Sequence, residues 1–179
     1  MAAYLKEEYT NRVVAELEQK LGVTNRMLVP RLQKIVLNMA FGIVSKDEQK
    51  NLVGDLTAIT GQKPKLCKAK KSISNFKLRE GMVIGAQVTL RGDRMWEFAH
   101  RFIATALPRI RDFHGIPNRG FDGRGNYTLG IKDHSIFPEL VEASAGHSGM
   151  DITFVTSSND NKAAKALLEA MGMPFAGRN

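Results

Sequence analysis

The chain has 179 residues, of which 43% are hydrophobic and 25% charged, a balance typical of a globular protein and not of a disordered one. The 26 Lys and Arg residues outnumber the 18 Asp and Glu residues, and the net charge of +8 indicates a polyanionic partner, either a nucleic acid or an anionic membrane surface. A solvated basic surface without a partner is the alternative. One cysteine, Cys67, excludes a disulfide within the chain, and neither a signal-peptide pattern nor a membrane-length apolar run occurs, so we expect a cytoplasmic protein with no membrane partner.

Residues 3–21 predict an amphipathic helix, because apolar side chains recur at four-residue spacing from Leu5 to Leu21. Gly22 is suited to the left-handed conformation that ends such a helix. Residues 31–40 then alternate with the period of two that is typical of a β-strand. One face of this strand carries Ile35, Leu37 and Met39, and the other carries Lys34, Val36 and Asn38.

Ser45 and Glu48 have the spacing of a capping box, which predicts the start of a second helix. Its inner face carries Leu52, Leu56 and Ile59, and Gly61 ends it. A second strand is predicted at about 64–71 and a third at 82–91. The third strand alternates apolar residues from Met82 to Leu90 with the polar residues Gln87, Thr89 and Arg91.

Asp93 is predicted to cap a third helix, which Pro108 ends. The apolar face of this helix comprises Trp96, Ala99, Ile103 and Leu107. Residues 109–126 are glycine-rich and irregular, and strand patterns return at 127–131 and 150–154. A last helix is predicted from near Asn159 to Gly172, and its buried residues are Ala164, Leu167, Leu168 and Met171.

This order of elements is not a regular alternation of strand and helix, so it predicts an α+β fold in one domain, 1–179. Its mainly antiparallel sheet has helices packed on one face and an open polar face on the other. The residues assigned to the open face are Lys34, Asn38, Gln87, Thr89 and Arg91, whose side chains can hydrogen-bond or pair with phosphate. An ordinary solvated sheet face is an equally good interpretation of this pattern.

The basic residues concentrate between Lys63 and Arg79, where there is no acidic residue. The run consists of Lys63, Lys65, Lys68, Lys70, Lys71, Lys77 and Arg79. It predicts a protruding basic loop at about 72–82 that neutralises phosphates, with Ser and Asn adding hydrogen bonds. No helical spacing of apolar residues accompanies it, which argues against a membrane-surface helix. A charged hairpin that protects a sheet edge from aggregation is the alternative.

Two further segments are biased in composition. Residues 109–127 interleave Arg109, Arg111, Arg119 and Arg124 with aromatic residues, and we favour a phosphate-binding role for some of the arginines but a packing role for Phe113 and Phe121. Residues 133–160 contain no Lys or Arg, and their acidic residues are Asp133, Glu139, Glu142, Asp151 and Asp160. That stretch is expected to face solvent or a basic protein.

No catalytic or metal site is predicted. GQKP at 61–64 does not match a phosphate-binding loop, and the four histidines lack metal-ligand spacing. Cys67 is more typical of a packed strand residue than of a reactive thiol. Asp112 and Asp122 could pair as general acid and base, but the neighbouring arginines explain them equally well.

Several long segments resemble the family of bacterial large-subunit ribosomal protein five, the L-five family. They are LNMAFG at 37–42, LTAITGQKPKLCKAKKSISNFKLREG at 56–81, VTLRGDRMWEF at 88–98, and PRIRDFHGI with FDGRGNYTLGI within 108–131. The motifs are in order and correctly spaced, and the resemblance extends over essentially the whole chain.

The resemblance implies a ribosome-bound structural protein, with no cofactor, that attaches 5S rRNA within the central protuberance and also contacts 23S rRNA. Carried over by position, the resemblance points to Asn38, Gln62 and Thr89 as rRNA contacts. With the open sheet face and the basic run, the full set of residues expected on rRNA is Lys34, Asn38, Gln62, Lys63, Lys68, Lys70, Lys71, Gln87, Thr89 and Arg91. The segment SISNFKLREG resembles the family loop that reaches the peptidyl-site tRNA, through Ser72, Asn75, Lys77 and Arg79. The acidic stretch, through Glu139 and Glu142, is expected to meet small-subunit protein thirteen, and neighbouring central-protuberance proteins are further partners.

Two other classes of function are weighed against this one. An enzyme acting on RNA or on a phosphorylated small molecule would need a concave pocket that holds Asp112 and Asp122 with perturbed pKa values. A regulatory RNA-binding protein outside the ribosome would differ in being found free of ribosomal subunits.

Overall fold

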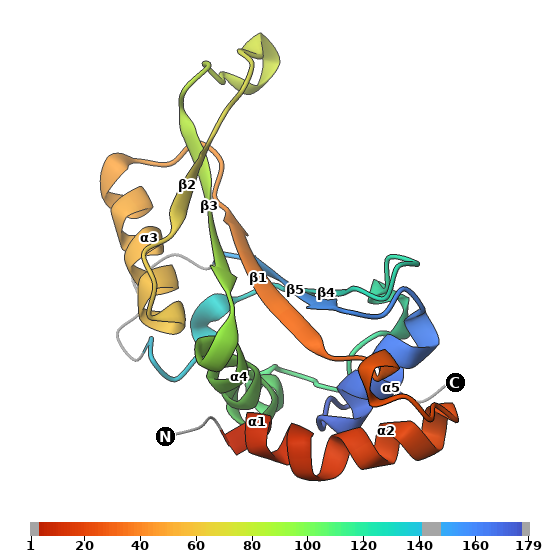
Figure 1. Ribbon diagram of the computed structural model, residues 1–179. Coiled ribbons are helices and arrows are strands. Elements are labelled where there is room, and N and C mark those ends of the chain that lie inside the picture. The colour runs from red at the N-terminus through yellow and green to blue at the C-terminus, as the bar shows by residue number, and fades with distance from the viewer. Residues whose placement is uncertain (1–3, 141–147, 177–179) are drawn as a thin grey trace. The chain divides into compact units, whose positions relative to one another are not determined.

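The computed structural model describes residues 4–140 and 148–176 and contains a five-stranded antiparallel sheet with the strand order β2-β3-β1-β5-β4. The strands are β1 (Leu32–Ala40), β2 (Lys65–Lys68), β3 (Val83–Leu90), β4 (Tyr127–Ile131) and β5 (Met150–Thr156). The α-helices are α1 (Tyr4–Glu8), α2 (Val14–Leu21), α3 (Lys46–Thr60), α4 (Gly92–Arg101) and α5 (Asn161–Ala170) (Figure 1). The predicted α+β class and the antiparallel sheet are confirmed.

The contacts within the chain divide it into two compact units. Unit 1 consists of residues 1–35, 90–129 and 153–179, and unit 2 consists of residues 36–89 and 130–152. The prediction of a single domain, 1–179, stays a prediction, and each unit is described by itself.

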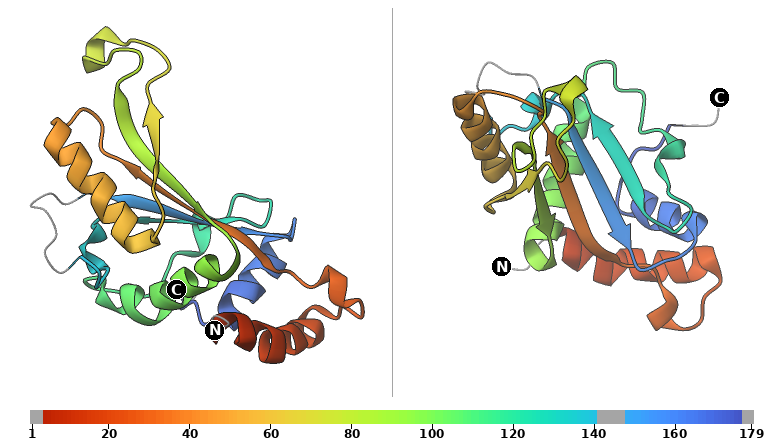
Figure 2. Two further views of the ribbon diagram at one scale, coloured as in Figure 1. Left: turned by 60° about the vertical axis from the view of Figure 1, so that its left-hand side comes forward. Right: turned by 90° about the horizontal axis from the view of Figure 1, so that it is seen from above.

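In unit 1, the predicted first helix is present, with one turn of π-helix at Tyr9–Val13 between α1 and α2. Gly22 ends it at φ 63°, as expected. The helix packs through Tyr9 against Trp96 of α4, with ring centroids 5.3 Å apart, and the Arg12 guanidinium donates to the Ala170 carbonyl of α5 at 3.0 Å. Figure 2 shows α1 and α2 beside α4 and α5.

The start and the end of α4 differ from their prediction. Asp93 does not cap this helix: the N-cap is Arg91, without a side-chain bond, and the Asp93 carboxylate accepts from Lys6 Nζ at 2.7 Å. This ion pair lowers the pKa of Asp93, chiefly through the hydrogen bond from Lys6. Pro108 does not end the α-helix either, because α4 passes at Phe102 into a π-helical turn and then into a 3₁₀ turn, Leu107–Arg109, whose first positions accommodate the proline.

The core of unit 1 contains a cluster of aromatic side chains. Phe102 lies between Phe98 and Phe154, with ring centroids 6.0 Å and 5.8 Å away. Tyr127 is fully buried beside Phe121 and Phe175, and its hydroxyl donates to the Pro117 carbonyl at 2.9 Å. Phe121 therefore pins the 109–126 segment to the core, as its predicted packing role requires.

Burial raises the pKa of the Tyr127 phenol to about 12. The unfolded chain should lose the Tyr127 proton near pH 10, whereas the folded protein should keep it until about pH 12. The contribution of this phenol to folding stability is therefore fully present below pH 10 and is lost as pH rises from about 10 to 12. We expect a loss of up to about 2 kcal/mol across that window in urea unfolding. Tyr127→Phe should be less stable at pH 8 but should lose less on going to pH 11, and an identical pH dependence for the variant would contradict this origin.

In unit 2, α3 begins with the predicted capping box. The Glu48 N–H donates to Ser45 Oγ at 3.2 Å, and the Ser45 N–H and hydroxyl donate to the Glu48 carboxylate, which lowers the pKa of Glu48. Leu52, Leu56 and Ile59 are buried, and Gly61 ends the helix at φ 64°. The predicted helix is confirmed over its whole length.

Ser45→Ala is expected to destabilise the protein by about 1 kcal/mol, because the Glu48 N–H in the first turn loses its acceptor, Ser45 Oγ. The measurement is the urea midpoint at an unchanged m-value. Ser135→Ala, at an exposed serine that caps no helix, is the control and should be nearly neutral.

Candidate nucleic-acid interface

The sheet face that the helices leave uncovered carries polar side chains in unit 2. On β3, Ala86 and Val88 are buried, so strand alternation turns Gln87 and Thr89 to the other face. On the neighbouring strand β1, Leu37 and Met39 are buried and Asn38 is half-buried. Asn38, Gln87 and Thr89 thus lie on two adjacent strands with their side chains on one face.

Gly85 allows these two strands to approach closely. A Cβ atom at Gly85 would lie 2.9 Å from the Met39 carbonyl oxygen, closer than real side chains come. The Phe41 and Gly42 N–H groups both donate to the Ile84 carbonyl, at 3.1 Å and 3.0 Å. The absence of a side chain at Gly85 therefore allows β1, which carries Asn38, to lie close to β3, which carries Gln87.

The β2–β3 register adds a cation to this face. Lys65 is opposite Gln87 and Cys67 is opposite Gly85, and the register shifts between Cys67 and Lys68. Lys65 is exposed, so its ammonium group is available beside the Gln87 amide. Sequence reasoning counted Lys65 in the basic run but did not assign it to the site, because the strand register is not visible in the sequence.

Gln62 and Lys63 lie in the short connection from α3 to β2. The Thr60 hydroxyl donates to the Leu56 carbonyl at 2.6 Å and accepts from the Gln62 N–H at 3.3 Å, which fixes the chain direction just after Gly61. Gln62 is half-buried and Lys63 is exposed. Thr60 is thus a positioning residue that the sequence analysis did not single out.

The connection from β2 to β3 is paired rather than irregular. The Ala69 N–H donates to the Met82 carbonyl, Ile73 and Leu78 form a further bridge, and the Ser72 hydroxyl accepts from the Glu80 N–H at 2.9 Å. Its end is a 3₁₀ turn, Ser74–Phe76, followed by Lys77 at φ 52°. Figures 1 and 2 show this hairpin continuing past the start of α3. The second strand itself is shorter than the predicted 64–71.

The side chains of this hairpin are almost all exposed. Among residues 4–140 and 148–176, no carboxylate pairs with the basic residues of the run, which are Lys63, Lys65, Lys68, Lys70, Lys71, Lys77 and Arg79. Ser72 and Asn75 are exposed between them, and Phe76 is 71% exposed. Uncompensated cations beside hydroxyl, amide and aromatic groups are suited to a polyanion with bases.

Two predicted site residues belong to unit 1. Lys34 is half-buried on β1, and Arg91 is exposed at the N-cap of α4. Asn38, Gln62, Gln87 and Thr89 all belong to unit 2.

Of the two carboxylates of the enzyme hypothesis, Asp122 has a structural role. The Asp122 carboxylate accepts from the Asn126 side chain and from the N–H groups of Arg124 and Asn126, and these bonds lower its pKa, the one from the Asn126 side chain most. Asp112 is an exposed turn residue at φ 52°. Within the described residues there is no group of three or more His, Cys, Asp or Glu side chains that could hold a metal ion.

Residues 133–140 and 148–160 of the acidic stretch belong to the described part of the chain. Glu139 is half-buried, and Glu142 lies outside the described residues. His134, at the start of this stretch, is 1% exposed, with its Nδ1 2.9 Å from the Ser148 carbonyl oxygen and its Nε2 3.4 Å from the Asp55 carboxylate of α3. This contact fixes the start of the acidic stretch to the helix.

No helix within 4–140 or 148–176 is both long and apolar enough to cross a membrane. A polar open sheet face next to an unneutralised basic hairpin defines an α+β protein of the RNA-binding class. A family model described as "Ribosomal protein L5" matches residues 25–79, and one described as "ribosomal L5P family C-terminus" matches residues 83–175. Two relatives, each called "Large ribosomal subunit protein uL5", come from Streptococcus pyogenes serotype M49 (strain NZ131) and serotype M5 (strain Manfredo). They are 50% and 49% identical to this chain, over 98% of its length and 99% of theirs.

The chain belongs to the ribosomal protein L5 family. It is accordingly a structural, non-enzymatic constituent of the large ribosomal subunit, bound to rRNA on cytoplasmic ribosomes. The family resemblance noted in the sequence is confirmed.

Proposed function

We propose that this chain binds 5S rRNA and helps to attach it in the central protuberance of the large subunit, next to 23S rRNA. The observation that supports this most directly is the open face of unit 2, where Asn38, Gln87 and Thr89 lie beside the cation of Lys65. Amide and hydroxyl groups on a rigid sheet can select an RNA shape and its 2′-hydroxyls. Lys63, Lys68, Lys70 and Lys71, with Lys34 and Arg91 of unit 1, supply phosphate contacts that carry affinity but little sequence information.

The hairpin end supports a second contact, with the peptidyl-site tRNA. Ser72, Asn75, Lys77 and Arg79 are exposed there. A paired hairpin can hold these groups away from the sheet face while that face is occupied. Lys77→Ala/Arg79→Ala should therefore weaken retention of tRNA in the peptidyl site without weakening the binding of 5S rRNA.

The acidic stretch is proposed to meet small-subunit protein thirteen at an intersubunit bridge, through Glu139 and Glu142. Carboxylates repel rRNA and attract a basic protein. Unchanged subunit association after charge reversal at both glutamates would argue against this contact. Neighbouring proteins of the central protuberance are further partners in the same proposal.

The test is binding of the purified chain to 5S rRNA over a salt series, with tRNA and a generic RNA duplex as competitors. Selective binding that persists near physiological salt is expected, and equal, steeply salt-dependent binding to all three RNAs would overturn the 5S assignment.

A matched pair of variants separates the two kinds of contact. Asn38→Ala should weaken 5S rRNA binding roughly tenfold and leave the salt slope unchanged, because it removes a hydrogen bond and no charge. Lys68→Ala should instead reduce the slope of log affinity against log salt by about 0.7 to 0.9. A change of slope in the asparagine variant, or none in the lysine variant, would contradict these roles.

A further inference from the structure

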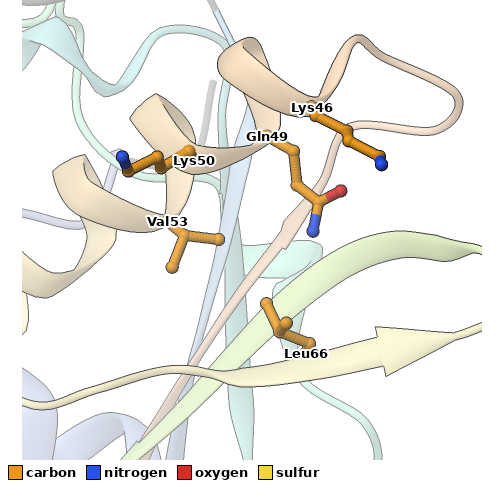
Figure 3. A pocket seen from close by; sticks show the side chains of 5 residues that line it. All are labelled: Lys46, Gln49, Lys50, Val53 and Leu66. Carbon is orange, nitrogen blue, oxygen red and sulfur yellow. The ribbon is translucent and has the colours of Figure 1, made fainter.

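A groove of about 360 Å³ lies between α3 and β2, within unit 2. It is lined by Lys46, Gln49, Lys50 and Val53 on α3 and by Leu66 on β2. The four α3 residues have the spacing i, i+3, i+4 and i+7, so they form one stripe of the helix. Figure 3 shows Gln49 and Val53 directed toward β2, and Leu66 directed from β2 toward the helix.

The groove combines an apolar floor with a cationic rim. Val53 and Leu66 form the floor, and Leu66 remains 40% exposed although it points toward the helix. Lys46 and Lys50 are exposed at the rim, and none of the residues that line the groove is acidic. Such a lining fits an occupant with an apolar side chain flanked by negative charges.

The strand that borders the groove is the edge strand of the sheet. In the strand order β2 is first, so it has a paired neighbour, β3, on one side only. Alternate residues of an edge strand direct their N–H and C=O groups away from the sheet, where they can pair with a further extended chain. A groove between an edge strand and a helix is a recurring site for an added peptide strand.

We propose that this groove binds an extended, acidic segment of a neighbouring protein, which adds to the edge of β2 as a further strand. An apolar side chain of the segment lies on Val53 and Leu66, and its carboxylates pair with Lys46 and Lys50. The site is separate from the open sheet face, because strand alternation directs Leu66 and Lys65 to opposite faces.

The edge-strand chemistry favours a polypeptide over RNA. A free strand edge presents donors and acceptors in alternation, and another extended polypeptide supplies both at the matching spacing. The phosphate oxygens of an RNA backbone are hydrogen-bond acceptors only. The 2′-hydroxyls would be the only backbone donors for the outward carbonyl groups of β2. The apolar floor gives a further preference for an aliphatic side chain.

The test uses the full chain, labelled with ¹⁵N, and a fluorescein-labelled synthetic peptide in which glutamate alternates with valine. The amide resonances of Lys65–Lys68 and of the first half of α3 should shift on titration. Lys46→Glu/Lys50→Glu should weaken binding about tenfold or more. The control Lys132→Glu/Lys162→Glu changes the net charge equally at exposed lysines that do not line the groove, and it should bind nearly as the parent does.

Peptides methylated on alternate backbone nitrogens test strand addition without changing the protein. Methylation in one register should abolish binding and methylation in the other should not, since only one edge of the added strand faces β2. Equal binding of both methylated peptides would overturn strand addition. An oligouridylate that shifts the same resonances and displaces the peptide would show an RNA site instead, and shifts confined to other residues would overturn the assignment of the groove.

Discussion

Replacing Lys68, Lys70 and Lys71 together by glutamine is expected to weaken rRNA binding roughly a hundredfold at physiological salt, because three phosphate contacts and their released counterions are lost. All three side chains are exposed, and no carboxylate among the described residues neutralises them. The slope of log affinity against log salt should fall by about 2 to 3. Filter binding of rRNA from low to physiological salt measures both quantities.

The matched control is a triple variant of lysines that already pair with carboxylates. Lys6 pairs with Asp93, and Lys20 and Lys165 both pair with Glu169. Changing these three to glutamine removes the same formal charge from the chain but should leave the salt slope almost unchanged. If both triple variants lose affinity equally, net charge and not the basic hairpin governs binding.

Gly125→Ala is expected to destabilise the protein by roughly 3–5 kcal/mol, the largest effect of any single substitution considered for this chain. Gly125 has φ +76°, and an added Cβ would collide with the Ser158 carbonyl group. The same residue is fixed by two bonds, from its N–H to Asn161 Oδ1 at 3.0 Å and from the Thr156 hydroxyl to its carbonyl at 2.7 Å. The loop cannot move aside without breaking them.

Thermal unfolding should show this loss as a fall in Tm of about 10 °C. Gly123→Ala is the control, because Gly123 also has a positive φ, +85°, but nothing lies within 4 Å of an added Cβ. Gly123→Ala should reduce the free energy of unfolding by only about 1–2 kcal/mol, the cost of placing alanine in the left-handed conformation. Equal effects of the two substitutions would show that backbone conformation, and not the Ser158 collision, determines the loss.

Features that depend on neighbouring residues in the chain were predictable. The capping box of Ser45 and Glu48 and the terminator Gly61 define α3 completely, since each signal acts within one helical turn. The alternation in β3, β4 and β5 predicted which of their side chains are buried, including Ala86, Leu129 and Ile152. For the candidate site, the open-face residues Asn38, Gln87 and Thr89 followed from the same alternation.

Features that depend on distant residues were not predictable. Asp93 has the local pattern of a helix cap, but Lys6, 87 residues away, takes its carboxylate. Lys65 is opposite Gln87 because of the β2–β3 register, and the composition of the basic run does not predict the register shift between Cys67 and Lys68. The edge position of β2, on which the peptide groove depends, is likewise a property of the strand order and of no single segment.

Unit 1 is built from three separate segments of the chain, which affects how it folds during translation. The N-terminal helix finds partners in α5, where Arg12 binds the Ala170 carbonyl and Lys20 pairs with Glu169, 149 residues further along. During translation residues 4–21 leave the ribosome long before these partners are made. Contacts so far apart in sequence slow folding and leave apolar faces exposed meanwhile. Leu5, Val13 and Leu17, which are buried in the folded chain, therefore wait for α5 to be made, while unit 2 can already assemble the β2–β3 hairpin against α3.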